Sequence, residues 1–163
     1  MKNAYFAGGC FWCITPMFRN LPGVTGVVSG YSGGDTDSPT YTEVKSQTTG
    51  HRETVKITYD PEKTDYTALL ELFISSVDPF DDGGQFIDRG FSYTLAVFYT
   101  DDAEKTAAEN RLSALARDTG RVPAVSVLPF RNFFDAEEYH QDYDLKNPSE
   151  FAEELEKSGR KKA

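Results

Sequence analysis

The sequence contains few of the residues that metal sites and covalent cross-links need. Its 163 residues include two cysteines and two histidines. Two cysteines form at most one disulfide, which excludes the disulfide-dense frameworks of small secreted domains. A tetrahedral zinc site would have to use both cysteines together with both histidines. A chain of this length buries roughly 70% of the surface that its unfolded form exposes, so it can fold without either aid.

Cationic residues and long apolar segments are also scarce. The formal net charge is −9, and the basic cluster of the chain lies at 160–162. Because binding of a phosphate backbone needs clustered cations, we expect no nucleic acid partner. No apolar run approaches the ~20 residues of a membrane-spanning helix, and the first residues lack the apolar core of a signal peptide. We expect a cytoplasmic monomer without membrane contact, in which residues from roughly 158 to 163 form a disordered basic tail.

Aromatic and aliphatic residues supply enough material for a core. The chain is 39% hydrophobic and holds 12 phenylalanines and 9 tyrosines, so we expect a single domain over residues 1–163. Alternating and helical hydrophobic patterns follow one another without internal repeats, which favours a two-layer sandwich of α/β or α+β class. The expected strands are 4–7, 24–29, 51–59, 93–99 and 125–128, of which 93–99 is apolar on both faces and should be central. The expected helices are one that begins at Cys10 and those over 65–77, 101–118, 135–143 and 149–157.

A Cys-x-x-Cys pair lies where the first strand gives way to two glycines and a helix. Cys10 is placed at a helix N-terminus, where unpaired N–H groups and the helix dipole favour the thiolate and lower the thiol pKa. Cys13 lies one helical turn away and can reach the Cys10 sulfur with small adjustments. Phe11 and Trp12, between the two cysteines, add bulky apolar surface next to the nucleophile. The pattern predicts a reactive redox thiol whose substrate has a small apolar part and a soft, electrophilic centre.

Glu53 is a candidate general acid because of its position in a strand. It shares strand parity with Val55 and Ile57, not with the polar positions Arg52 and Lys56. A carboxyl on an apolar face is desolvated, which raises its pKa and can keep it protonated near neutral pH. A protonated carboxyl beside a thiolate can donate a proton in the reaction. The alternative is that Glu53 lies at the fraying edge of the sheet and meets water.

Six separated motifs resemble those of the class A peptide methionine sulfoxide reductases, which reduce the S epimer of methionine sulfoxide. In chain order they are Gly8-Gly9-Cys10-Phe11-Trp12, Gly30-Tyr31-Ser32-Gly33-Gly34, Ser38-Pro39-Thr40-Tyr41, Thr49-Gly50-His51-Arg52-Glu53, the stretch from Gln85 to Tyr93, and Glu138-Tyr139-His140-Gln141-Asp142-Tyr143. The glycine-rich second motif and the polar residues up to Pro39 could form a long active-site loop. The resemblance extends from Ala4 to about Pro148. It implies an α+β fold, in which a two-layer sandwich with a mixed sheet has a ferredoxin-like core.

The resemblance also assigns roles to individual residues. It makes Cys10 the nucleophile and Glu53 the acid that protonates the sulfoxide oxygen, with Tyr41 and Tyr93 as hydroxyl donors to that oxygen. Asp88 would orient the site and, through water, the substrate backbone. Phe11 and Trp12 would surround the methyl group of the substrate.

The expected reaction is reduction of methionine-S-sulfoxide, in proteins and free, to methionine through a sulfenic acid on Cys10. Cys13 would resolve this sulfenic acid as a disulfide, which thioredoxin or a similar dithiol would reduce. The resemblance implies no cofactor and no metal. Without it, Tyr41 and Tyr93 would be ordinary half-buried tyrosines, Asp88 a turn residue and His140 a packing or capping residue.

The chain departs from the family pattern in three places. Thr15 occupies a position that is usually glutamate, which we interpret as a structural group near the helix start. Thr94 replaces an arginine, which could change how the flanks of an oxidised peptide are held. The family's additional cysteines near the C-terminus are missing, so Cys13 is the one internal candidate for the resolving thiol.

Other classes of function stay open at the level of the residues alone. Cys10, Cys13, His51 and His140 could form the zinc site of an interaction module. The two cysteines could be buried structural residues, or the surface of Phe11 and Trp12 could read methionine-containing peptides without catalysis. A thioredoxin-like oxidoreductase fits the Cys-x-x-Cys spacing but not the residues around it.

Overall fold

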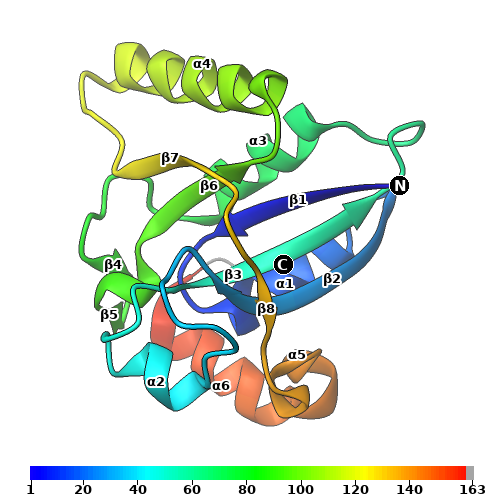
Figure 1. Ribbon diagram of the computed structural model, residues 1–163, viewed down its shortest axis with the longest axis vertical. Helices are drawn as coiled ribbons and strands as arrows, with labels where there is room; N and C mark the ends of the chain where they lie inside the picture. The colour runs from blue at the N-terminus through cyan, green and yellow to red at the C-terminus, as the bar shows by residue number, and fades with distance from the viewer. Residues whose placement is uncertain (161–163) are drawn as a thin grey trace.

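The computed structural model describes residues 1–160, which form a six-stranded sheet with helices against one face (Figure 1). The strand order is β7-β6-β1-β3-β2-β8, and β4 and β5 pair separately. The six-stranded sheet is mixed, because β6 and β7 are parallel while its other pairs are antiparallel. This confirms the expected α+β fold with a mixed sheet. The strands are β1 Lys2–Ala7, β2 Val24–Ser32, β3 Arg52–Tyr59, β4 Gly84–Gln85, β5 Asp88–Arg89, β6 Leu95–Tyr99, β7 Val125–Pro129 and β8 Phe134–Asp135.

The helical layer contains the long helices that the hydrophobic pattern predicts. The helices are α1 Phe11–Arg19, α2 Tyr41–Lys45, α3 Tyr66–Ser76, α4 Asp102–Thr119, α5 Tyr143–Lys146 and α6 Pro148–Ser158, with 3-10 turns at Phe91–Tyr93 and Glu138–His140. Asp65 and Asp101 cap α3 and α4 by accepting hydrogen bonds from backbone N–H groups of their first turns, and Gly120 ends α4 in the left-handed conformation. The ends of these two helices therefore follow from local capping chemistry. Across residues 1–160, no helix has the length and apolar character that crossing a membrane requires.

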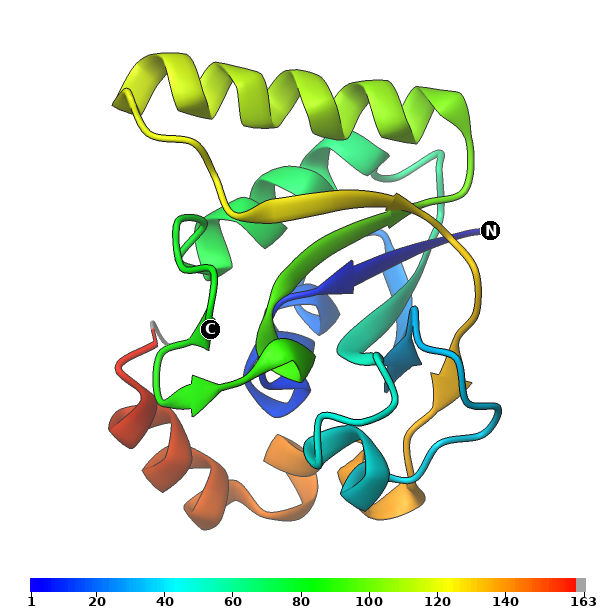
Figure 2. The same cartoon turned by 60° about the vertical axis from the view of Figure 1, so that its left-hand side comes forward.

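The core lies between the sheet and helices α1, α3 and α4. Phe6 of β1 stacks on Phe18 of α1 and on Phe73 of α3, with ring centroids 5.7 Å and 5.0 Å apart. The other face of the sheet is covered by the segment that follows β7, where Phe130 stacks on Tyr5. Figure 1 shows this segment passing in front of the sheet as it runs from β7 to β8, and Figure 2 shows it from the side. Strand β6 is buried along most of its length and lies inside the sheet, as its apolar pattern predicted.

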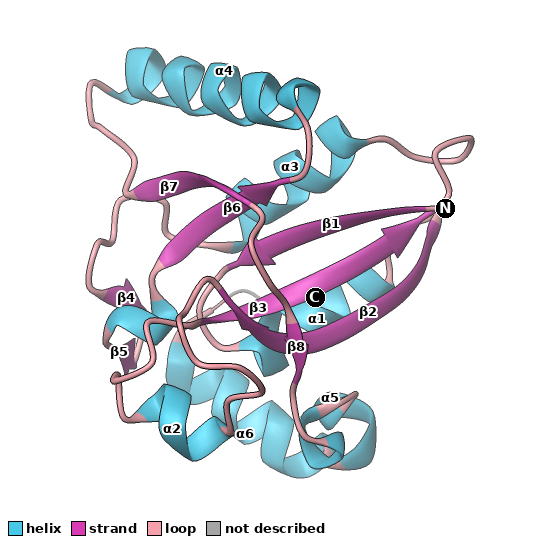
Figure 3. Ribbon diagram, viewed as in Figure 1, coloured by secondary structure: helices cyan, strands magenta, loops and turns pink. Residues whose placement is uncertain are grey.

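Two local predictions were wrong, both because strand pairing decides the conformation. The predicted loop at 30–34 starts within β2, whose residues up to Ser32 pair with β3, while Gly30 and Tyr31 also pair with β8. The predicted helix over 135–143 is instead the end of β8, a 3-10 turn and the start of α5 (Figure 3). Ala136 N–H donates to the Ser29 carbonyl of β2, and Asp142 adopts a positive φ of 51° that interrupts a helix.

The end of the chain also differs from the expectation of a disordered tail beginning at about 158. Helix α6 extends to Ser158, and Gly159 ends it in the left-handed conformation. The side chain of Arg160 is then buried, because its guanidinium donates to the carbonyls of Ser76 and Gly8. Residues 161–163 of the expected tail lie outside the described residues.

Candidate active site

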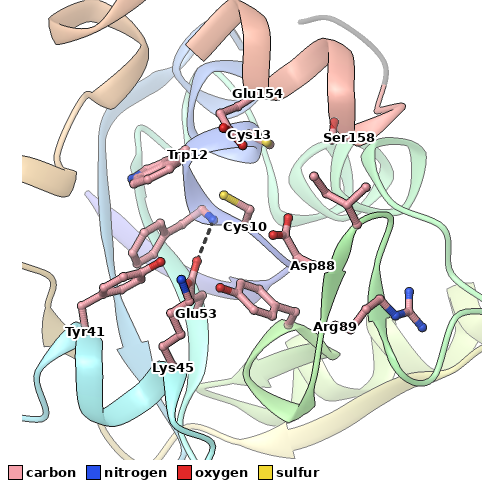
Figure 4. A pocket seen from close by; sticks show the side chains of 13 residues that line it. Cys10, Trp12, Cys13, Tyr41, Lys45, Glu53, Asp88, Arg89, Glu154 and Ser158 are labelled. Atoms are coloured by element: carbon pink, nitrogen blue, oxygen red, sulfur yellow. Dashed lines mark hydrogen bonds between the residues drawn. The ribbon is translucent and has the colours of Figure 1, made fainter. Parts of the chain in front are cut away.

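Cys10 lies at the junction of β1 and α1, and its side chain faces a cavity of about 410 Å³. Gly9 makes this junction possible with a φ of 86°, and a Cβ atom there would lie 2.7 Å from Cβ of Gln85. Figure 4 shows the Cys10 side chain among those of Cys13, Asp88 and Glu53. The structure places all of the predicted site residues around this one cavity: Cys10, Phe11, Trp12, Cys13, Tyr41, Glu53, Asp88 and Tyr93. Its volume suits one amino-acid side chain with part of its backbone.

The two cysteines form a pair of free thiols with unequal proton affinity. Cys10 is partly exposed and Cys13 is buried, and Cys13 N–H donates to the Cys10 carbonyl over 3.1 Å. The pKa of Cys10 is raised, first by its hydrogen bond to the Cys13 sulfur and then by burial, whereas the same hydrogen bond lowers the pKa of Cys13. Burial and the neighbouring Cys13 sulfur thus favour the protonated form of Cys10.

This arrangement corrects the expectation that the helix N-terminus lowers the pKa of Cys10. Cys10 is the N-cap residue of α1, but its side chain accepts no capping hydrogen bond. Glu53 accepts the hydrogen bond from the N–H of Phe11, the first residue of the helix. The N–H of Cys13 donates to the backbone carbonyl of Cys10. The sulfur is left without the N–H donors that would stabilise its thiolate.

Glu53 is a buried carboxyl on β3, directly opposite Tyr31 of β2. It is 2% exposed, which excludes the alternative of a frayed edge in water. Phe11 N–H donates to Oε1 over 3.2 Å and favours the charged form, but desolvation outweighs this bond and raises the pKa of Glu53 to about 8. The carboxyl is therefore mostly protonated at neutral pH, which is the first of the two alternatives that strand parity left open.

Two tyrosines and an aspartate reach the cavity from different elements. Tyr41 is the first residue of α2, which a capping box between Thr40 and Glu43 holds, and burial raises its pKa to about 12. Tyr93 comes from the 3-10 turn before β6, and burial raises its pKa as well. Both hydroxyls thus remain proton donors at any physiological pH. Burial also raises the pKa of Asp88, on β5.

The apolar part of the cavity is built from stacked aromatic rings. Trp12 stacks on Tyr143 with ring centroids 3.8 Å apart, and its indole N–H donates to Nδ1 of His140 over 3.0 Å. Phe11 is buried and packs near both Tyr31 and His140. The tilted and stacked geometry fixes the orientation of Trp12 at the cavity, with its polar edge satisfied.

His140 packs within the aromatic cluster, in agreement with the packing role expected from the sequence. Other residues at or around the cavity were not predicted from the sequence. Glu137 holds α2 in place by accepting from Tyr41 N–H and from the Tyr31 hydroxyl, over 2.9 Å and 2.8 Å. The cavity is also lined by Lys45, Ile87, Arg89, Glu154 and Ser158. No local sequence signal marks these residues, because long-range packing of α2, β5 and α6 brings them together.

The departures from the family pattern are accommodated locally. The Thr15 hydroxyl donates to the Phe11 carbonyl over 2.7 Å and lies 3.2 Å from the Ser29 hydroxyl, so it ties α1 to β2. Thr94 accepts a hydrogen bond from Nε of Arg52, which also lies over the ring of Phe91. Within residues 1–160, no group of three or more histidine, cysteine or acidic side chains is arranged to hold a metal ion.

Comparisons with known proteins agree with the geometry. The sequence model described as "Peptide methionine sulfoxide reductase" matches residues 2–163. The chain is 46% identical to peptide methionine sulfoxide reductase MsrA 2 of Staphylococcus aureus (strain MW2), over 98% of this chain and 92% of the relative. It is 49% identical to peptide methionine sulfoxide reductase MsrA of Bacillus subtilis (strain 168), over 96% of this chain and 90% of the relative.

Solved structures of one relative resemble the fold. Reduced Mxr1 from Saccharomyces cerevisiae has a TM-score of 0.85 at 30% identity, covering 91% of this chain and 86% of that chain. The same yeast protein in complex with Trx2 has a TM-score of 0.60 at 22% identity, covering 87% of this chain and 84% of that chain. Together with the sequence matches, these findings show that the chain belongs to the peptide methionine sulfoxide reductase family and is an enzyme of its class A, MsrA.

Proposed function

We propose that the enzyme reduces the S epimer of methionine sulfoxide with Cys10 as the nucleophile and Glu53 as the general acid. The observation that carries this proposal is the buried Glu53, whose pKa of about 8 keeps it protonated in the same cavity as the Cys10 thiol. A sulfoxide is a poor electrophile until its oxygen is protonated. A neutral carboxyl next to a sulfur nucleophile supplies that proton at physiological pH.

The chemical step transfers the sulfoxide oxygen to the enzyme. Cys10 releases its proton to solvent and, as a thiolate, attacks the sulfoxide sulfur to form an S–S bond. Glu53 protonates the oxygen, which then passes to the Cys10 sulfur as two bonds break: the bond between the oxygen and the methionine sulfur, and the new S–S bond. Methionine leaves with two more electrons than the sulfoxide had, and Cys10 becomes a sulfenic acid.

The other residues of the cavity bind and orient the sulfoxide. The hydroxyls of Tyr41 and Tyr93 donate to its oxygen, which they can do because burial keeps both phenols protonated. Phe11 and Trp12 surround the methyl group, and the stacking of Trp12 on Tyr143 holds that wall rigid. Asp88 orients the site and, through water, the backbone of the substrate.

We propose that Cys13 resolves the sulfenic acid. Its sulfur attacks that of Cys10, the S–S bond forms and the oxygen leaves as water. Cys13 lies one turn along α1, with a hydrogen bond between the two thiols. A thioredoxin-type dithiol then reduces the disulfide by exchange. The yeast relative has been solved in complex with Trx2, which supports this choice of reductant.

Both protein-bound and free methionine sulfoxide are proposed substrates, because the cavity has room for the side chain and nearby backbone atoms of one residue. Cytoplasmic location and a monomeric state stay predictions from the sequence. Cell fractionation and sedimentation of the purified chain test them.

The assay compares both sulfoxide epimers, followed by mass spectrometry, with thioredoxin and its reductase as the recycling system. We expect the S epimer alone to be reduced, and Cys10→Ser to abolish the reaction. Cys13→Ser should form methionine in one turnover and then stop cycling with thioredoxin. Substantial turnover by Cys10→Ser would refute the nucleophile, whereas binding of a peptide without loss of its oxygen would indicate a non-catalytic reader.

A further inference from the structure

Arg160 is a buried cation beside the cysteine pair, although it lies 147 positions after Cys13 in the chain. It follows α6 directly, and its guanidinium reaches down to the start of α1. Nη2 donates to the carbonyl of Gly8 over 3.1 Å, and Nη1 donates to the carbonyl of Ser76 over 3.0 Å. The contact is so close that a Cβ atom on Gly9 would lie 2.9 Å from Nη2. The glycine that precedes Cys10 thus leaves room for this guanidinium.

The charge of Arg160 has no carboxylate within ion-pair distance among the residues that the structure describes. Its side chain is 5% exposed, and Nε has no hydrogen-bond partner within residues 1–160. The guanidinium lies over the ring of Phe86 and donates to two carbonyls, but without a carboxylate partner a nearby anion is favoured. Burial lowers the pKa of Arg160, and the anionic forms of Cys13, Cys10 and Asp88, in that order, partly offset this effect.

The anionic form of Cys13 is stabilised by the positive charge of Arg160. Its sulfur is buried, and four charged or titratable groups act on it from three elements: Cys10 at the start of α1, Asp88 of β5, Glu154 of α6, and Arg160 after α6. Arg160 is the cation among them, while Asp88 and Glu154 oppose a negative charge. Lys45, a cation that lines the cavity, acts on Glu53 and Asp88.

We propose that Arg160 is a positioning residue that stabilises the Cys13 thiolate and so makes Cys13 the resolving thiol of Cys10. The inference rests on the proposed function, because it concerns the step after methionine has left. In that step the Cys13 thiolate attacks the Cys10 sulfur, the S–S bond forms, and the hydroxide of the sulfenic acid leaves as water after taking a proton from solvent. Arg160 does not line the cavity that binds the sulfoxide, so the rate of methionine formation should depend on it less.

The first test follows one turnover of the reduced full chain with a peptide containing methionine-S-sulfoxide at pH 7. Rapid quenching and mass spectrometry give the rate of methionine formation and the rate of Cys10–Cys13 disulfide formation. We expect Arg160→Met to slow disulfide formation about tenfold or more, because nucleophilicity follows the thiolate fraction. Methionine formation should change less than about threefold, and Arg160→Lys, which keeps the charge, should recover part of the lost rate. The control Lys157→Met removes an exposed cation of α6 and should change neither rate. Equal slowing of both steps by Arg160→Met, or no slowing of disulfide formation, would overturn the proposal.

A second test needs no turnover, so it stands apart from the proposed function. In the Cys10→Ser chain, alkylation of Cys13 by iodoacetamide is followed against pH, with and without Arg160→Met. We expect the arginine substitution to move the midpoint of alkylation upward by about one pH unit, the equivalent of a tenfold smaller thiolate fraction. An unchanged midpoint in a variant that is folded by circular dichroism would refute the role of Arg160. Persistent turnover by Cys10→Ser would instead refute the proposed function.

Discussion

Replacement of Glu53 by glutamine should stabilise the protein at neutral pH while it removes activity. The folded chain keeps Glu53 protonated up to a pKa of about 8, whereas the ordinary value is 4.5. Because the folded-state pKa is raised, the contribution of the protonated carboxyl to stability is fully present below pH 4.5 and is lost as the pH rises through 8. At about 1.4 kcal/mol per pKa unit, the protonation of Glu53 costs about 3 kcal/mol of folding stability at pH 7.

Glutamine avoids this cost because it has no proton to bind. Its amide oxygen can accept the Phe11 N–H in place of Oε1, so the contact with the start of α1 is kept. Its amide N–H groups face the cavity, where water can reach them. We expect a net gain of about 1–3 kcal/mol in the free energy of unfolding at pH 7, after allowance for an imperfectly satisfied amide. Activity should fall about 10²–10⁴-fold, since the amide cannot donate its proton to the sulfoxide as an acid does.

Urea denaturation at several pH values between 5 and 8 measures the difference directly. The free energy of unfolding of the unmodified chain should carry a downward slope with pH that is absent from Glu53→Gln. Glu62→Gln, on an exposed turn, is the matched control and should keep the slope. If Glu53→Gln is no more stable at pH 7 and retains the slope, the carboxyl is not held protonated and the reasoning fails. A loss of activity smaller than about tenfold would independently argue against general acid catalysis.

Three further substitutions test the support of the site and the core. Tyr93→Phe should lower kcat about tenfold or more, because it removes one of the two proposed donors to the sulfoxide oxygen. An unchanged kcat would remove Tyr93 from the mechanism. Glu137→Gln should lower kcat/KM about threefold to tenfold in steady-state kinetics, since it weakens the hydrogen bond from Tyr41 N–H by about 1 kcal/mol. An unchanged kcat/KM would mean that this hydrogen bond does not position α2. Phe73→Ala should cost about 3–5 kcal/mol of stability in urea denaturation, because it empties the centre of the aromatic core next to Phe6; a loss below 1 kcal/mol would contradict that packing.

The features that the sequence predicted best are those with a local physical cause. Asp65, Asp101 and Gly120 mark helix ends through hydrogen bonds to residues within one turn, so their effect is visible in the sequence. Strand parity ties Glu53 to Val55 and Ile57 and so offered burial as one of two alternatives, and β3 does lie inside the sheet between β1 and β2. In each case the information lies within a few residues of the feature.

The features that the sequence missed depend on contacts between distant segments. The stretch 135–143 was predicted to be helical, but pairing of β8 with β2 extends its first residues instead. Arg160 looked like part of a solvated basic cluster, and only the close approach of α6 to the start of α1 reveals that it is buried. Cys10 was assigned a lowered pKa from its helix-start position. The structure shows that Glu53 accepts the hydrogen bond from the first N–H of that helix. The hydrogen bond with Cys13 is the main cause of the raised pKa of Cys10.

The most direct test of the account is the fate of the sulfoxide oxygen in one turnover. The Cys13→Ser chain is mixed with one equivalent of a peptide whose methionine-S-sulfoxide carries heavy oxygen, and the quenched protein is analysed by mass spectrometry. The account predicts that each methionine formed is matched by one heavy oxygen on the peptide that contains Cys10. Methionine formed while Cys10 remains an unmodified thiol would contradict it.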